Sequence, residues 1–130
     1  QMTSADRAFD DVSYRIQYAI IVSSGNITQM FIGNDNLLEV DLLHIGPNCT
    51  TRGTFAYCKN LKRVTVHQIE GTNNTSFIFL GSKQLAKTLG QDGMIEILKK
   101  LGVYDEWYNG VNRSHFFECP YNGTILSFAA

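Results

Sequence analysis

Three histidines are the side chains of this chain best suited to acid–base chemistry or metal binding. His44, His67 and His115 are widely spaced, and none of them falls in a metal-type pair with a cysteine or a carboxylate. His44 and His67 follow two equivalent predicted strands, so we expect both of them on one surface as solvated polar groups. The sequence therefore predicts no metal site, no cofactor and no catalytic set of residues.

Three cysteines are the candidate nucleophiles and disulfide partners. Because the number is odd, at most one internal bridge forms, and Cys49–Cys58 is the candidate pair. Cys119 is then left free or pairs outside this chain. The alternative is that the cysteines are reduced and buried as small hydrophobic residues. A nucleophile pair with His67 would need an exposed Cys58, which the position of Cys58 in the repeat described below contradicts.

The glycosylation pattern Asn-x-Ser/Thr is frequent in this chain. The pattern starts at six of the ten asparagines. Serine and threonine together make up 18 of the 130 residues, so chance alone would place one of them two residues after far fewer asparagines. This density indicates a secreted eukaryotic or viral glycoprotein. The alternative is an Asn- and Thr-rich chain in which the pattern is never modified. The candidate sites are Asn26, Asn48, Asn73, Asn74, Asn112 and Asn122.

The composition is that of a folded domain, since 44% of the 130 residues are hydrophobic and 18% are charged. The net charge of −1 and the lack of a basic stripe argue against a nucleic-acid partner. No apolar run is long enough to span a bilayer. The first residues lack the charged start and apolar stretch of a signal peptide, so we expect an exported form to be a mature fragment.

Two stretches of the chain, residues 31–42 and 55–66, match at an offset of 24 residues. A period of this length is typical of a solenoid, in which each unit buries its apolar face against the next unit. Aliphatic residues alternate with polar residues at the end of each stretch, which predicts two short parallel strands. The coinciding pairs are Phe31/Phe55, Asn36/Asn60, Leu37/Leu61, Val40/Val64 and Leu42/Val66.

The polar residues of these two strands should face outward. They are Glu39 and Asp41 in the first unit, and Arg63 and Thr65 in the second. The offset places Glu39 beside Arg63 on neighbouring strands, as an opposite-charge pair worth about 0.2–1 kcal/mol. We therefore expect the register to be supported from both faces of the sheet.

The N-terminal segment should cap the open edge of this stack. Helical spacing predicts a short helix over residues 4–12. Strict alternation that includes Tyr18, Ile20 and Val22 predicts a strand over residues 13–22, with these apolar side chains on its buried face.

A third unit begins at Phe79 and then fades, because Thr88 and Gly90 replace the inward aliphatic pair. An apolar face and a terminal glycine predict a helix over residues 92–102 in its place. Trp107 and the tyrosines beside it either form a contact surface or pack this part of the chain onto the helix.

The chain should close with a terminal β-hairpin, whose two strands cover residues 115–119 and 124–128. The length is that of one domain. We therefore predict a single domain, residues 1–130, made of an N-terminal cap (1–30), a repeat core (31–90) and a helix and hairpin cap (91–130).

The run Phe55-Ala-Tyr-Cys58-Lys-Asn-Leu61-Lys-Arg-Val64-Thr-Val66 resembles the leucine-rich repeats of the BspA-like surface-protein family. That family repeats an aromatic residue, two spacers, a cysteine, two spacers and Leu-x-x-Ile-x-Ile, often after an Ile-Gly pair such as Ile45-Gly46. The resemblance covers about residues 31–88 and implies a right-handed solenoid with a parallel sheet and an irregular far side. It also implies a reduced core cysteine, at a place that Asn34, Cys58 and Ser82 share, and adhesion or recognition at a cell or virion surface.

We therefore predict an α/β or β-rich fold with a short leucine-rich-repeat-like core of parallel strands. The predicted function is non-catalytic recognition of a protein or glycan partner by a secreted, cell-surface or virion-surface protein. A viral structural or envelope-glycoprotein fragment, with a receptor-binding or assembly role, is the alternative, and a small α+β enzyme is the third hypothesis. The predicted binding face is the outer surface of the repeat strands, with Glu39, Asp41, His44, Arg63, Thr65 and His67.

Overall fold

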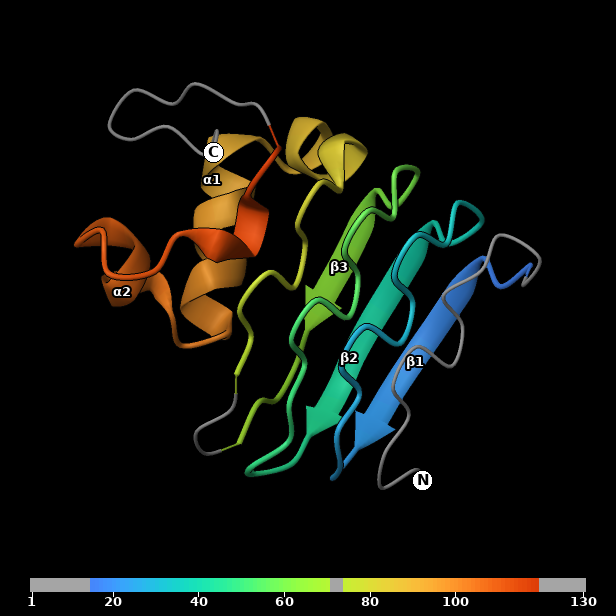
Figure 1. Ribbon diagram of the computed structural model, residues 1–130, viewed down its shortest axis with the longest axis horizontal. Coiled ribbons are helices and arrows are strands. Elements are labelled where there is room, and N and C mark those ends of the chain that lie inside the picture. Colours follow the sequence, from blue (N-terminus) through green and yellow to red (C-terminus); the bar gives the residue numbers. More distant parts are fainter. Residues whose placement is uncertain (1–14, 71–73, 120–130) are drawn as a thin grey trace.

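The computed structural model describes residues 15–70 and 74–119. The fold is mixed α/β, with a parallel three-stranded sheet in the order β1-β2-β3 followed by helices (Figure 1). The α/β class and the parallel strands were both predicted. The elements are β1 (Tyr18–Ser23), β2 (Glu39–Ile45), β3 (Arg63–Val66), α1 (Lys83–Lys100), α2 (Tyr104–Tyr108) and a short 3-10 helix, η1 (Ser114–Phe116).

The register of the sheet follows the 24-residue offset. Glu39 lies beside Arg63, and Leu42 lies beside Val66, as the matching stretches predict. Leu42 and Val66 are buried together with Ile21 of β1, which is the other neighbour of Leu42. Side chains alternate between the two faces of a strand, so this register fixes one face of the sheet as the core face.

The prediction that β1 buries Tyr18, Ile20 and Val22 is wrong. These three side chains are exposed, and Ile21 between them is buried. The register with β2 decides the outcome, because Ile21 is placed beside Leu42 on the core face. The strand pairs with β2 as part of the same sheet, and the predicted helix over residues 4–12 lies outside the described residues.

The chain returns along the other side of the core in segments that also pair with one another. Alternate N–H groups of residues 27–33 donate to carbonyls of residues 50–56, and those of residues 51–57 donate to carbonyls of residues 74–80. The left-handed backbone conformation recurs at the same 24-residue offset in these segments. It occurs at Gln29, Gly53 and Phe77, and again at Gly33, Tyr57 and Gly81.

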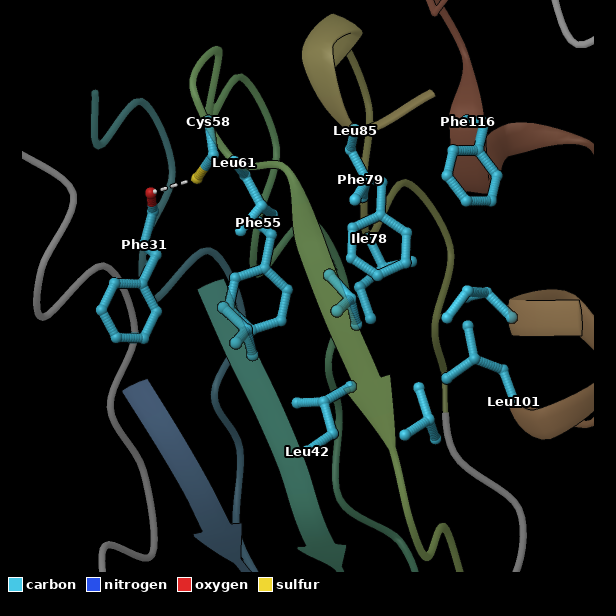
Figure 2. Packing of buried hydrophobic residues seen from close by; sticks show 14 of the residues in the cluster. Phe31, Leu42, Phe55, Cys58, Leu61, Ile78, Phe79, Leu85, Leu101 and Phe116 are labelled. Carbon is cyan, nitrogen blue, oxygen red and sulfur yellow. Dashed lines mark hydrogen bonds between the residues drawn. The ribbon is translucent and has the colours of Figure 1, made fainter. Parts of the chain in front are cut away.

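A row of stacked phenylalanines fills the core between the sheet and the return segments (Figure 2). The rings of Phe31 and Phe55 are 5.7 Å apart, and those of Phe55 and Phe79 are 5.9 Å apart. The predicted third unit therefore contributes its aromatic residue to the core. Phe116 continues the row, with its ring 5.2 Å from that of Phe79.

A second row, of small hydrogen-bond donors, runs beside the rings. Cys58 Sγ donates to the carbonyl of Phe31 at 3.1 Å, as Figure 2 shows, and Ser82 Oγ donates to the carbonyl of Phe55 at 2.6 Å. Cys119 Sγ donates to the carbonyl of Phe79 at 3.3 Å. The segment Phe116–Cys119 therefore occupies the place of a fourth unit.

The predicted strand over residues 115–119 is wrong, because these residues belong to the return side of the fold. Residues 114–116 form η1, and the carbonyls of His115 and Phe117 accept hydrogen bonds from Phe79 and Gly81 of the preceding return segment. This pairing continues the return side of the fold and leaves no hairpin partner among the described residues. The other predicted strand, over residues 124–128, lies outside them.

Helix α1 begins at Lys83, earlier than predicted, and lies beside β3 at the end of the sheet opposite β1 (Figure 1). Leu85 and Ala86 in its first turns are buried, so packing holds this part of the chain in a helix. The helix bends sharply at Gly90, where φ is 67° and ψ is 179°. Glycine adopts this conformation far more readily than other residues.

Candidate functional site

The outer face of the sheet carries a column of apolar side chains. Tyr18, Ile20 and Val22 of β1 are 53%, 56% and 46% exposed, and Leu43 of β2 is 44% exposed. The β1–β2 register shifts after Ile21, so that Val22 lies beside His44 and Leu43 is an extra residue in β2. Contiguous exposed apolar side chains on a folded domain often mark an interaction surface.

Two rows of charged residues lie beside this apolar column. Arg63 Nη1 is 3.6 Å from Glu39 Oε1, an ion pair that the sequence predicted. His67 Nε2 is 2.9 Å from Asp41 Oδ1, at ion-pair distance but without the alignment of a hydrogen bond. Thr65 lies beside Asp41 and is exposed, so five of the six predicted binding residues are neighbours on this face.

His44, the sixth residue, lies at the rim of the face. Its Nε2 is 2.6 Å from Glu70 Oε2. Sequence reasoning did not include Glu70, although the pairing of Ile45 with Ile69 extends the same parallel register to this position. Exposed ion pairs such as Glu39–Arg63 contribute about 0–1 kcal/mol to stability, so the main effect of the polar pairs on this face is to fix side-chain positions on the surface.

The cysteines are buried free thiols, and the candidate Cys49–Cys58 disulfide is not formed. Cys49 Sγ donates to the carbonyl of Gly25, and Cys58 Sγ donates to that of Phe31. Burial raises the pKa of Cys58 to about 12 and that of Cys119 to about 11. Thiols with such pKa values are almost entirely protonated near pH 7 and are poor nucleophiles.

His115 is the one histidine in the core. It is 1% exposed, its Nε2 lies 3.2 Å from Thr75 Oγ1, and its Nδ1 has no hydrogen-bond partner among the described residues. Burial lowers the pKa of His115 to about 4, which keeps the imidazole neutral. Within residues 15–70 and 74–119, no group of three His, Cys, Asp or Glu side chains is placed to hold a metal ion.

The Asn-x-Ser/Thr patterns have a structural role at three places. The Oδ1 atoms of Asn26, Asn74 and Asn112 each accept a hydrogen bond from the backbone N–H of the serine or threonine two residues on. Such side-chain turns favour asparagine independently of glycosylation. Asn48 differs, since it is exposed at the tip of a turn with φ of 63°. Asn73 and Asn122 lie outside the described residues.

The aromatic cluster near the end of the described chain is mainly a packing feature. Trp107 is buried and lies 5.8 Å from the ring of Tyr104. Helix α2, which carries both residues, packs against α1. Of the two alternatives raised by the sequence, packing onto the helix is the one observed for Trp107.

No helix in the described residues is both long and apolar enough to cross a membrane. Compared with protein-family models, with curated protein sequences and with solved structures, the chain has no significant match.

Proposed function

We propose that this protein is a non-catalytic recognition domain that binds a macromolecular partner through the outer face of its sheet. The observation that carries this proposal is the exposed apolar column of Tyr18, Ile20, Val22 and Leu43 beside the charged rows of β2 and β3. A surface with an apolar strip and a polar border has the composition of many protein interfaces.

Each part of the face has a distinct role in this proposal. The apolar column supplies the area that is removed from water, and Tyr18 supplies an aromatic anchor of the kind enriched at binding hot spots. The Glu39–Arg63 and Asp41–His67 pairs supply directional groups that orient the partner. The buried, protonated cysteines and the buried His115 supply no nucleophile or base to this surface.

We also propose that the fold is a short leucine-rich-repeat-like solenoid similar to those of the BspA-like surface proteins. Three observations support this proposal: the 24-residue register of the strands, the row of stacked phenylalanines, and the small donors Cys58 and Ser82 at the cysteine position of the second and third units. A secreted, cell-surface or virion-surface location follows from the same proposal.

Charge reversal in one ion pair tests the binding face. The variant is Arg63→Glu, and its matched control is Lys100→Glu, since each removes a surface cation that lies within 3.6 Å of a glutamate. Fluorescently labelled wild type and variants are applied to a panel of intact cells, and the bound protein is measured by flow cytometry. We expect Arg63→Glu to lose binding that Lys100→Glu retains, with circular dichroism showing both variants folded. Equal binding by the two variants would contradict the assignment of this face.

A viral structural or envelope-glycoprotein fragment is the second candidate, and the exposed position of Asn48 favours it. A glycan attached there would extend into solvent without breaking a hydrogen bond to a described residue. A glycan on Asn112 would disrupt the hydrogen bond from its Nδ2 to Ser76 Oγ. Mass spectrometry of protein secreted from eukaryotic cells should find Asn48 modified and Asn112 unmodified. An unmodified Asn48 in that material would argue against the glycoprotein candidate.

A further inference from the structure

A second surface feature lies away from the sheet face, between the third return segment and the loop that follows α2. It is an open groove of about 680 Å³, formed by residues 76–77 and by parts of the segment 110–117. Its volume falls within the roughly 300–1,000 Å³ that is typical of ligand sites. None of its lining residues belongs to the outer face of the sheet, so the groove is a separate feature.

Most of the polar groups in the groove are already paired with one another. Asn112 Nδ2 donates to Ser76 Oγ at 3.1 Å, and Asn112 Oδ1 accepts from the hydroxyl of Ser114 at 2.7 Å. The backbone N–H of Phe77 donates to Ser114 Oγ at 3.1 Å. These side chains hold the two walls of the groove together and leave little hydrogen-bonding capacity for a ligand.

The apolar part of the groove consists of two half-buried rings and one exposed aliphatic side chain. The rings of Phe77 and Phe117 meet edge to face at 5.9 Å. Val111 is 76% exposed, the most exposed large hydrophobic residue in the described chain. Arg52 lies over the ring of Phe77, with its guanidinium carbon 4.7 Å from the ring centre. An apolar side chain of a ligand would contact these groups.

Arg113 supplies a fixed positive charge in the groove. Its Nε donates to the carbonyl of Trp107 at 2.8 Å, and its Nη2 donates to the carbonyl of Tyr108 at 3.3 Å. A guanidinium has five N–H groups, so three remain after these two bonds. Neither Arg113 nor Arg52 forms an ion pair with any residue of the described chain. Within the described residues, the cation is therefore positioned by backbone carbonyls and has no anionic partner.

We propose that this groove binds an acidic peptide segment of a partner protein. A glutamate or aspartate carboxylate of the peptide pairs with the free N–H groups of Arg113, and a neighbouring apolar side chain packs on Phe77, Phe117 and Val111. A carboxylate matches the remaining donors because a guanidinium can pair with both of its oxygens at once. A phosphate would call for further donors, and the serine and asparagine groups that could supply them are already paired.

The test uses a defined set of probe peptides and the full chain. The probes are N-acetyl-Leu-Glu-Leu amide and its Leu-Gln-Leu and Leu-phosphoserine-Leu counterparts, titrated into isotope-labelled protein and followed by NMR. We expect saturable shifts of the Val111 methyl groups and the Arg113 Nε–H with the glutamate peptide. Affinity should fall by about tenfold or more for the glutamine peptide, which lacks the charge.

Two variants at the exposed position 111 separate the effect of an added charge on binding from any effect of the substitution on folding. Val111→Glu places a carboxylate beside Arg113, and we expect it to weaken binding of the glutamate peptide by about tenfold or more. Val111→Gln has the shape of the Val111→Glu side chain without its charge and loses the same apolar contact, so it should bind the glutamate peptide about fivefold or more tightly than Val111→Glu does. Three results would each overturn the proposal: no saturation up to about 10 mM, equal binding of the glutamate and glutamine peptides, or tighter binding of the phosphoserine peptide.

Discussion

Lowering the pH from 7 to 4 should destabilise this protein because the buried imidazole of His115 must then take up a proton. The ring is 1% exposed, and in the part of the chain that the structure describes its Nδ1 has no partner that could accept a hydrogen bond from a second N–H. Burial lowers the pKa of His115 in the folded protein to about 4, against 6.5 for the free side chain. At about 1.4 kcal/mol per pH unit, this difference corresponds to about 3 kcal/mol.

The sign follows from proton binding in the two states. Between pH 6.5 and pH 4 the unfolded chain holds a proton on His115 that the folded chain does not hold, so acid favours unfolding. The contribution of His115 to stability is therefore fully present above pH 6.5. It falls as the pH drops and is lost by about pH 4.

Urea unfolding of the wild type and of His115→Gln at pH 7, 6, 5 and 4 measures this effect. Carboxylates titrate in both proteins, so the difference between the two pH profiles isolates His115. Between pH 7 and pH 4 the wild type should lose about 3 kcal/mol more than the variant. Parallel profiles would show that His115 does not cause this loss of stability. An NMR titration of the wild type in which the His115 ring protonates near pH 6.5 would do the same, whether or not the variant folds.

Three further predictions concern the core and the bend in α1. Gly90→Ala should lower the free energy of unfolding by about 1–3 kcal/mol, because φ is 67° at this position. An added Cβ would meet no atom within 4 Å, so the loss comes from the backbone conformation and not from a clash. A loss below about 0.5 kcal/mol in urea unfolding would contradict this. Phe55→Ala should lower the free energy of unfolding by about 3–5 kcal/mol, because the ring is fully buried between two other rings. A shift of the urea midpoint that corresponds to less than about 1 kcal/mol would show that the stack is not tightly packed. Cys58 and Cys119 should react with a thiol reagent only after unfolding, since burial raises their pKa values to about 12 and about 11; rapid labelling of either thiol in the native protein at pH 8 would contradict their placement in the core.

The sequence was sufficient to predict the centre of the fold. Val40/Val64 and Leu42/Val66 identify the inward residues of two strands, and the 24-residue offset places Glu39 beside Arg63. These predictions succeeded because each unit repeats the same local environment, so one alignment sets the register for both strands. The same logic extends to the ring of Phe79, although the strand of its unit is replaced by a helix.

The fourth unit was not predicted because α1 and α2 interrupt the period. Phe116 and Cys119 have the spacing of Phe55 and Cys58, but they follow Phe79 by far more than 24 residues. A search for the pair Phe-x-x-Cys without a fixed period would have found them. The terminal-hairpin prediction failed for this reason, since the same residues fit a strand pattern when the repeat is not considered.

The apolar column was missed because alternation identifies two faces of a strand without saying which face is buried. Tyr18, Ile20 and Val22 are the more hydrophobic set in β1, so the sequence favoured them as core residues. The register with β2 places Ile21 in the core and leaves the column exposed. The residues that contradict the simplest pattern are therefore the residues that form the candidate binding face.

A comparison of two tyrosines tests the proposed recognition face most directly. Tyr18 on the outer face and Tyr108 on α2 are 53% and 50% exposed, so truncation to alanine removes similar surface at two different places. The measurement is cell binding of Tyr18→Ala and Tyr108→Ala against the wild type, over a range of protein concentrations. We expect Tyr18→Ala to weaken binding by about tenfold or more and Tyr108→Ala to leave it unchanged. Unchanged binding by Tyr18→Ala, or an equal loss by both variants, would contradict it.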